Sequence, residues 1–354
     1  MSLLVSADRM YTGLQPYTVE EGAVLVEDGR IKDVGPRAEL EGRATEQVVL
    51  PGTLLPGLCD VHTHIVLNAS ANPEAQLREE SRTATVIRAQ QNLRRHLEAG
   101  VTTIRDMGGV DDIDLELRDA VAQGLVRGPR MLVAGRAICM TGGHGCWFGV
   151  ECDGPDETRR EARRNLKHQV DHLKVIATGG VMTEGVEPGA PQLSEEEMRA
   201  VCEEGRKAGR RVGAHAQGTE GIRNALRAGV YTIEHGFYID DETVALFLEM
   251  GAMLVPTFAA AAGIVGGREQ GVPAFMVEKL EQVGSHHRES FRRCVQSQVT
   301  FATGTDAGTP LNPHGSIARE MELMVDCGIP PVEALRAATG YASVALARRD
   351  LGAL

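Results

Sequence analysis

The sequence predicts an α/β protein whose main body is a (β/α)8, TIM-like barrel. Eight short, apolar, β-rich runs occur between residues 54 and 306, and helical patterns separate most of them. Strands and helices that alternate eight times are typical of this barrel, which needs about 250 residues. Five of the runs also carry a side chain that can bind a metal ion, and the barrel gathers its strand ends at one mouth.

Each predicted strand is a short apolar run that leads into a loop. In chain order the runs cover residues 54–61, 101–106, 130–135, 173–177, 211–215, 230–235, 252–257 and 299–306. The helical patterns between them cover residues 82–99, 113–123, 157–172, 194–208, 220–228, 242–250 and 274–297. Capping residues mark several helix starts, namely Ser194 with Glu197 as a capping box, Asp156 and Asp241.

Two histidines one residue apart, His62 and His64, close the first run. Side chains at positions i and i+2 of a strand point the same way, so both imidazoles are aimed at one point. Imidazole nitrogen is a preferred ligand of zinc and neighbouring divalent metals. The pair alone also fits an ordinary strand-to-loop turn. Four later runs add metal-competent side chains, which are Lys174, His215, His235 and Asp306. Five such strand ends in register favour a metal site.

Lys174 stands out because lysine is rare in this chain. The 37 basic residues include only five lysines, which are Lys32, Lys167, Lys174, Lys207 and Lys279. Lys174 lies inside an apolar strand, where an unpaired ammonium is costly and the pKa is expected to fall. A neutral amine can add carbon dioxide to form a carbamate, whose two oxygens can bridge two metals. The alternative is a buried lysine paired with a carboxylate such as Asp306.

Composition limits the class of protein. The net charge of −12 argues against nucleic acid or an anionic membrane as the main partner. No apolar run reaches the length of a membrane span, and the N-terminus lacks the features of a signal peptide. Seven cysteines without a Cys-x-x-Cys pair indicate reduced thiols. We therefore expect a cytoplasmic enzyme with a small-molecule substrate.

The order of these side chains on strands one, four, five, six and eight resembles the amidohydrolase superfamily in its two-metal form. The resemblance covers nearly the whole chain. It implies that the first metal is held by His62, His64, Lys174 as N6-carboxylysine, and Asp306. It implies that the second metal is held by Lys174, His215 and His235, with a bridging water or hydroxide.

The resemblance also implies a mechanism. Two metals about 3.5–4 Å apart lower the pKa of the bridging water toward 7 and polarise the scissile carbonyl. Asp306 would take the proton from that water and pass it to the leaving amine, although a role as ligand only is the alternative. Zinc is the expected metal, but manganese, cobalt and iron accept the same donors.

Two loop motifs bear on the substrate. Thr-Gly-Gly-His-Gly at residues 141–145 and Ile-Glu-His-Gly-Phe-Tyr at 233–238 resemble the branch with Xaa-Pro and Xaa-Arg/Lys dipeptidases and N-acyl-amino-acid carboxypeptidases. By that resemblance, His144 and Tyr238 contact the amide or terminal carboxylate of a dipeptide or N-acyl amino acid. His144 would otherwise pin its loop, and Tyr238 would pack against a neighbouring loop. Trp147 and Phe148 form either an apolar wall for a substrate side chain or loop packing.

Three other functions are alternatives to this prediction. The single-metal deaminases of the superfamily typically carry a glutamate three residues after the fifth-strand histidine. Here Ala216, Gln217 and Gly218 follow His215, and Lys174 is present, so deamination is the weaker prediction. Hydrolysis of a cyclic amide or lactone on the same barrel is the second alternative. A pseudoenzyme that serves as an assembly subunit is the third.

The remaining histidines are predicted to be structural or exposed. We expect His286 and His287 to face solvent and His96 to lie on a helix surface. His172 is expected to be structural, and His314 is expected to anchor its loop.

A second, smaller domain is expected at the ends of the chain. Residues 1–53 alternate β-like runs with turns, and Asp28-Gly29 is a strong hairpin signal. This pattern resembles the small β-sandwich that superfamily members build from both termini. We expect domains at 1–53 and 54–345 and a truncated tail at 346–354, where further strands would begin. Pairing in a homo-oligomer could cover the exposed strand edges.

Overall fold

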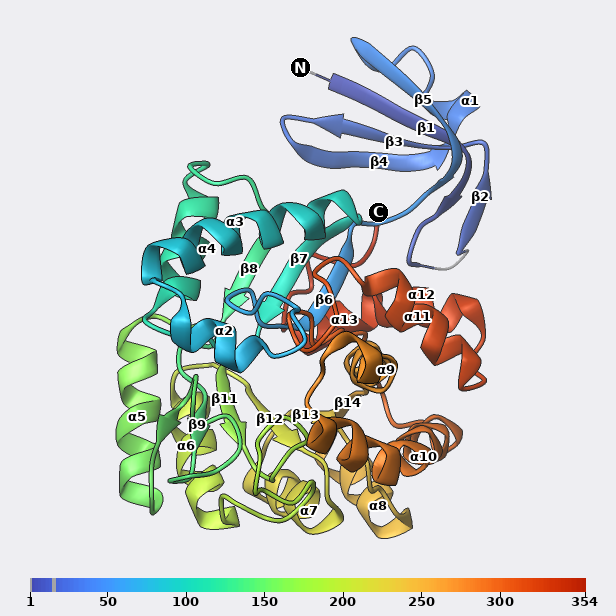
Figure 1. The fold of residues 1–354 in the computed structure, drawn as a ribbon. Helices are drawn as coiled ribbons and strands as arrows, with labels where there is room; N and C mark the ends of the chain where they lie inside the picture. The colour runs from blue at the N-terminus through green and yellow to red at the C-terminus, as the bar shows by residue number, and fades with distance from the viewer. Residues whose placement is uncertain (1, 15–16) are drawn as a thin grey trace.

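The computed structural model describes residues 2–14 and 17–354, which form a small N-terminal sheet beside a larger barrel (Figure 1). The sheet contains β1 (Ser2–Tyr11), β2 (Thr18–Glu20), β3 (Gly22–Glu27), β4 (Arg30–Pro36) and β5 (Glu46–Leu54), with α1 (Arg37–Leu40) beside it. β1 is central because it pairs antiparallel with β2 and β3 and parallel with β5. Asp28 and Gly29 both have positive φ between β3 and β4, which confirms the predicted hairpin.

The barrel strands are parallel and lie in two sheets. The first contains β6 (Leu58–Thr63), β7 (Val101–Asp106) and β8 (Arg130–Val133). The second contains β9 (Ile138–Cys139), β10 (Val150–Glu151), β11 (Leu173–Ile176), β12 (Val212–Ala216), β13 (Thr232–His235) and β14 (Met253–Val255). Short β9 follows β8 in the chain and pairs with β11, which brings the two sheets together.

The eighth predicted strand closes the barrel without forming a long regular ladder. Residues 299–306 contact β14 through a parallel bridge between Leu254 and Phe301. A second bridge, between Thr63 and Ala307, joins the residue that directly follows this segment to the end of β6. The predicted (β/α)8 barrel is therefore confirmed, with the carboxyl ends of its strands at one mouth.

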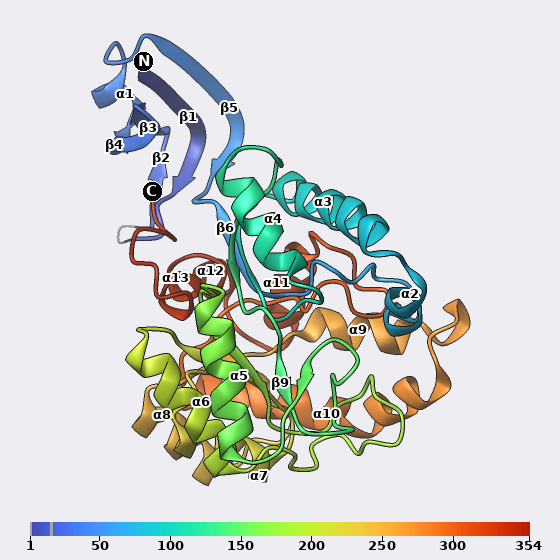
Figure 2. The ribbon, with the colours of Figure 1, turned by 90° about the vertical axis from the view of Figure 1, so that its left-hand side faces the viewer.

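Helices surround the barrel (Figure 2). They are α2 (Pro73–Glu79), α3 (Arg82–Glu98), α4 (Ile113–Ala122), α5 (Pro155–Lys167), α6 (Glu195–Lys207), α7 (Thr219–Ala228), α8 (Asp241–Met250), α9 (Phe258–Gly266), η1 (Arg268–Gln270), α10 (Ala274–Gln296), α11 (Ile317–Asp326), α12 (Pro331–Ala337) and α13 (Gly340–Ala345). The helix predicted over 157–172 ends five residues early because Gln169 adopts a left-handed conformation with φ of 61°. No helix within residues 2–14 and 17–354 is both long and apolar enough to cross a membrane.

The predicted helix caps were partly right. Ser194 and Glu197 form the expected capping box at the start of α6. The caps at Asp156 and Asp241 were wrong, because α5 and α8 begin one or two residues earlier, after Gly154 and Asp240. Both aspartates instead lie in the first turn, where a negative charge favours the helix dipole.

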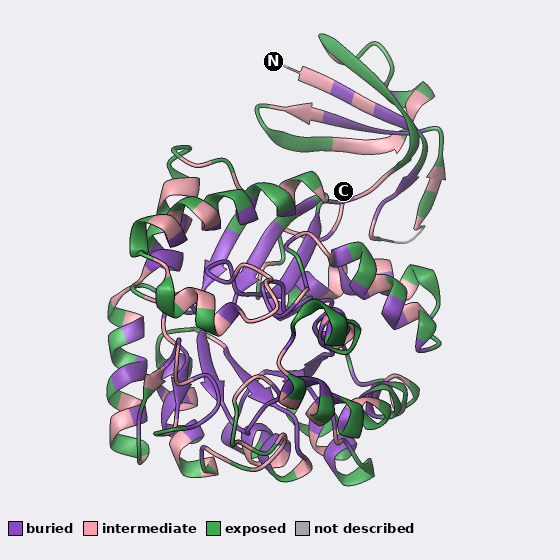
Figure 3. Ribbon diagram, in the orientation of Figure 1, coloured by how far each residue is buried: buried purple, intermediate pink, exposed green. Residues whose placement is uncertain are grey.

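Burial separates the two parts of the molecule. The barrel strands are almost wholly buried, whereas the surrounding helices expose their outer faces (Figure 3). β5 is exposed along most of its length, and the buried residues of the small sheet gather around Leu4, Ala23, Leu25 and Leu40. The C-terminus lies beside this sheet, where the N–H of Leu354 donates to the carbonyl of Thr12 at 2.9 Å.

Candidate metal centre

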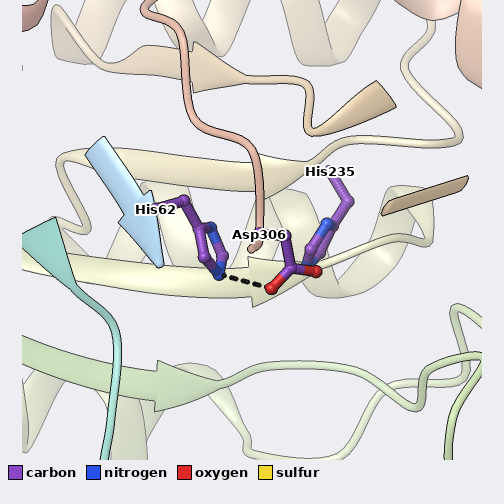
Figure 4. A group of neighbouring side chains, drawn as sticks. All are labelled: His62, His235 and Asp306. Carbon is purple, nitrogen blue, oxygen red and sulfur yellow. Dashed lines mark ion pairs between the residues drawn. The ribbon is translucent and has the colours of Figure 1, made fainter. Parts of the chain in front are cut away.

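The six predicted ligand side chains meet in one cavity at the mouth of the barrel. Its lining includes His62, His64, Lys174, His215, His235 and Asp306. One ligand atom each from His62, His235 and Asp306 lies within 4.8 Å of the other two (Figure 4). Nε2 of His62 and Nε2 of His64 each lie 3.4 Å from Oδ1 of Asp306. Strands one, six and eight thus converge as the barrel geometry predicts.

Hydrogen bonds orient the two histidines of the first strand. Nδ1 of His62 lies 2.8 Å from Oε2 of Glu234, and Nδ1 of His64 lies 3.0 Å from the carbonyl of Gly108. Both partners accept, so each Nδ1 carries the proton. Each Nε2 is then left with a free lone pair on the side of Asp306, which is the state that binds a metal.

The other two histidines are oriented in the same way. The hydroxyl of Thr257 donates to the carbonyl of Pro256 at 2.6 Å, so it accepts from Nδ1 of His235 at 2.7 Å. Nε2 of His215 lies 3.4 Å from the carbonyl of Gly179, which leaves Nδ1 of His215 free. Every imidazole of the set therefore keeps one nitrogen for a cation.

Burial keeps these imidazoles neutral. It lowers the pKa of His64 to about 4 and lowers the pKa values of His62, His215 and His235 well below the usual range. Desolvation is the largest cause in each case, since it penalises the charged form. Neutral imidazole is the form that metal binding requires.

Lys174 is 1% exposed, and burial lowers its pKa to about 8 against the opposing effect of Glu234 and Asp306. No carboxylate forms an ion pair with Lys174 anywhere in the described ranges 2–14 and 17–354. A lowered pKa leaves more of the amine neutral at neutral pH, and a neutral amine is what carbamate formation requires. Burial also raises the pKa of Asp306 to about 8, partly offset by Lys174, and a bound cation would favour the ionised form.

The backbone is strained where three strands end at this cavity. His235, Thr257 and Asp306 have φ values of 75°, 57° and 57°, in the left-handed region. Such conformations cost about 1–3 kcal/mol each and persist only where the surroundings fix them. Strained backbone of this kind is typical of functional sites, where the position of a side chain matters more than local stability.

His144 lies in the same cavity, while Tyr238 does not line it. Nδ1 of His144 lies 2.8 Å from the hydroxyl of Thr183, and its ring is 4.4 Å from that of His215. Tyr238 instead packs against α10, with its ring 4.9 Å from that of His286. Its neighbour Phe237 lines the cavity in its place.

The family model of the amidohydrolase family matches residues 53–354. The chain belongs to the amidohydrolase family. A second model, the imidazolonepropionase-like composite domain of bacteria, matches residues 22–45 in the small sheet.

Known relatives of this amidohydrolase include the ochratoxinase of Aspergillus niger. It is 27% identical over 358 residues, which cover 93% of this chain and 73% of that protein. A crystal structure of a Xaa-Pro dipeptidase with bound methionine in the active site has a TM-score of 0.91 at 28% identity, and covers 100% of this chain and 91% of its own. A prolidase complexed with N-methylphosphonate-L-proline has a TM-score of 0.90 at 28% identity, and covers 100% and 90%.

Family membership and these relatives support hydrolysis of amide bonds as the general chemistry of this amidohydrolase. Members of the family generally use a divalent metal centre, and the structure has a group of His and Asp side chains that could hold an ion. Oriented neutral imidazoles, a carboxylate and a buried amine facing one point are the donors that such ions accept. The residues present therefore fit the implied metal.

Glu234 and Arg105 lie beneath the site and were not among the predicted site residues. The carboxylate of Glu234 accepts from His62, from Nη2 of Arg105 at 2.8 Å and from the hydroxyl of Thr232 at 2.5 Å. Strict strand alternation would place Glu234 and His235 on opposite faces. The positive φ of His235 breaks that alternation, so both side chains serve the barrel interior. Arg105 and Glu234 are charged residues inside apolar strands, and this feature of the sequence could have identified them.

The predictions for the other histidines agree only partly with the structure. The predicted exposure of His287 was wrong, because its Nε2 bonds the carbonyl of Pro256 at 2.8 Å inside the core. His96 is also buried, and its Nε2 lies 3.1 Å from Nδ1 of His314. His314 bonds the carbonyl of Leu67 at 2.9 Å, which fits the expected loop anchor.

Proposed function

We propose that this amidohydrolase cleaves the amide bond of a dipeptide or N-acyl amino acid at a centre of two divalent ions, with zinc as the expected metal. The observation that carries the proposal is the convergence of all six donor side chains on one cavity. The relatives named for Xaa-Pro dipeptidase and prolidase activity support the substrate class. The rest of the wall is largely apolar, which suits a small organic substrate.

The proposed ligands are divided between the two ions as the family resemblance implies. We assign one ion to His62, His64, Asp306 and the carbamate of Lys174, and the other to His215, His235 and the same carbamate. When bound, such a pair lowers the pKa of a water molecule toward 7 and polarises the substrate carbonyl.

Asp306 acts as the proton carrier in this proposal. It is 8% exposed, and its Oδ1 lies 3.4 Å from the Nε2 atoms of His62 and His64. From there the carboxylate takes the proton of the attacking water and delivers it to the leaving amine.

His144 supports the substrate carbonyl. Burial lowers its pKa to about 3, so the ring is neutral. Its Nδ1 shares a hydrogen bond with the hydroxyl of Thr183, and in the tautomer with the proton on Nε2 that nitrogen can donate to the carbonyl oxygen. Tyr238 keeps its predicted role in substrate contact only if it leaves His286, so no step is assigned to it.

Metal analysis combined with an amide screen tests this proposal. The protein is purified without chelators and assayed against dipeptides and N-acyl amino acids. We expect two equivalents of metal per chain and release of free amino acid. One equivalent with release of ammonia would favour deamination instead. Cleavage of cyclic amides or lactones alone would favour that chemistry, and a metal-free, inactive protein would contradict the proposal.

Replacing Gly180 with alanine is expected to displace His144. A Cβ at Gly180 would lie 2.5 Å from Nε2 of His144, closer than real contacts allow, while the backbone N–H of His144 is fixed to Gln192. We expect kcat/KM to fall about a hundredfold to a thousandfold with metal content unchanged, which is the size of one lost transition-state hydrogen bond. Gly284→Ala is the control, because nothing lies within 4 Å of its added Cβ. Equal activity of both variants would remove His144 from the mechanism.

A further inference from the structure

The start of α9 is capped by a carboxylate from another helix. Glu320 lies on α11 and is 0% exposed, and no step of the proposed mechanism uses it. Its Oε1 accepts from the backbone N–H of Phe258 at 2.9 Å, and its Oε2 accepts from that of Ala259 at 2.6 Å. The first N–H groups of a helix have no partner within it, and a negative charge beside them favours the helix dipole. Glu320 therefore replaces an N-cap side chain.

The residue at the N-cap position of α9 is Thr257, and it does not cap the helix. Threonine is a common N-cap residue, but this side chain accepts no capping hydrogen bond from α9, every residue of which the structure describes. Its hydroxyl instead donates to the carbonyl of Pro256 at 2.6 Å and accepts from Nδ1 of His235 at 2.7 Å. The hydroxyl is turned toward the histidine, and Glu320 supplies the cap in its place.

The backbone of Thr257 is strained and is held on both sides. Its φ of 57° lies in the left-handed region, which a β-branched residue rarely adopts and which persists only where the surroundings fix it. The two residues that follow it are those whose N–H groups Glu320 binds. On the other side, the carbonyl of Pro256 accepts from Nε2 of His287 on α10 at 2.8 Å. The position of the Thr257 hydroxyl thus depends on α11 as well as α10.

We infer that Glu320 is a positioning residue of the proposed metal centre, which orients His235 by capping α9 and so leaving the hydroxyl of Thr257 for the imidazole. The inference rests on the proposed function, because His235 is assigned there to the second ion. With Nδ1 of His235 bound to the hydroxyl, the other ring nitrogen is left for a cation. Glu320 itself is assigned no contact with substrate or metal.

A cycle of two single variants and their double variant tests this inference. Thr257→Val removes the hydroxyl at similar size, and Glu320→Gln leaves one acceptor oxygen for two N–H groups. Affinity for the second equivalent of zinc is measured by competition with a chromogenic chelator. We expect Thr257→Val to lower this affinity about tenfold to a hundredfold and Glu320→Gln to lower it about tenfold. In the double variant Glu320→Gln should add no further loss, because the hydroxyl through which it acts is already absent.

A spectroscopic measurement tests the same point without metal or hydrolysis. NMR of the histidine side-chain nitrogens in the metal-free protein reports which nitrogen of His235 carries the proton, and His235→Asn identifies its signals. The native protein should have the proton on Nδ1, and Thr257→Val and Glu320→Gln should each shift part of it to Nε2. Thr257→Ser and Glu320→Asp keep the hydroxyl and both carboxylate oxygens, respectively, and should lie closer to the native protein.

Controls keep the outcomes distinct. Glu322→Gln changes an exposed glutamate of the same helix and should leave zinc affinity and the His235 tautomer unchanged. Thermal unfolding of each variant measures any loss of stability separately. Glu320 variants that are only less stable, with native zinc affinity and native tautomer, overturn the inference, and so does an additive loss of affinity in the double variant. A native protein that has the expected tautomer and binds zinc but cleaves no amide would count against the proposed function and not against Glu320.

Discussion

Replacing Lys174 with methionine is expected to lower kcat/KM for an amide substrate by about a thousandfold or more. The variant lacks the group that we assign to both metals, so bound metal should fall below two equivalents per chain. A thousandfold loss corresponds to about 4 kcal/mol of transition-state stabilisation, within the range that metal catalysis supplies. Steady-state kinetics and metal analysis of the same samples measure both effects.

The stability of this variant separates a lost centre from a lost fold. Burial lowers the pKa of Lys174 from its usual 10.5 to about 8, so the folded state disfavours the ammonium form. At pH below about 8 that cost lowers stability, and a methionine removes it. The metal-free variant should therefore unfold at the same or a higher temperature than the metal-free native protein. Exposed Lys167→Met is the control and should leave activity and metal content unchanged.

A carbamate adds a specific signature to the same experiment. Because it forms from carbon dioxide, metal loading in bicarbonate-depleted buffer should give low activity that added bicarbonate restores. Full metal content and full activity of Lys174→Met, or loading that is indifferent to bicarbonate, would contradict the assigned bridge.

Replacing Glu234 with alanine is expected to produce the largest loss of stability. The carboxylate is 0% exposed and compensates the buried guanidinium of Arg105, which is 3% exposed. Removing one partner of a buried ion pair costs about 3–5 kcal/mol, because the other charge is left without compensation. We expect a decrease of that size in the free energy of unfolding, measured by denaturant titration of the metal-free protein.

The same change should weaken metal binding. Glu234 accepts from Nδ1 of His62 and so fixes the tautomer that leaves Nε2 free. Loss of such a partner typically lowers metal affinity about tenfold to a hundredfold. A competition assay with a chromogenic chelator measures this, and Glu234→Gln, which keeps one acceptor oxygen, should lie between the native protein and Glu234→Ala.

Two sets of control variants show how much of the loss of stability is specific to the buried charge of Glu234. Glu98→Ala removes an exposed partner of Arg94 and should change stability by at most about 1 kcal/mol. The double variant Glu234→Leu with Arg105→Leu removes both buried charges, so it should lose less stability than the two single changes added together. Unchanged stability and metal affinity in Glu234→Ala would show that His62 is oriented by other means.

The barrel could be predicted because each of its strands and major helices can be identified from a short stretch of sequence. Each strand is a short apolar run and each major helix has its own periodicity, so their alternation identifies the fold without knowledge of contacts. Segments without a clear hydrophobic periodicity were harder to predict. The helix α9 begins with Phe258 and four alanines, a run without a polar face, and α5 ends early at a left-handed Gln169. Such boundaries depend on backbone conformations that periodicity does not report.

The proposed ligand positions could also be predicted from the sequence, but their surroundings could not. His62, Lys174, His215 and Asp306 could be proposed together because parallel strands of one barrel must end at the same mouth. His287 and His96 show the opposite case. Helical position alone suggested exposure, whereas the structure buries both against residues from other elements.

The sequence by itself determined the order of strands and helices and the side chains carried at the strand ends, because these follow from periodicities of two and 3.6 residues. Only the tertiary structure decided which nitrogen of each imidazole is free and that Arg105 and Glu234 lie beneath His62. These features depend on partners distant in the chain, from 22 positions for His235 with Thr257 to 172 positions for His62 with Glu234. No local pattern encodes contacts that form only when the barrel closes.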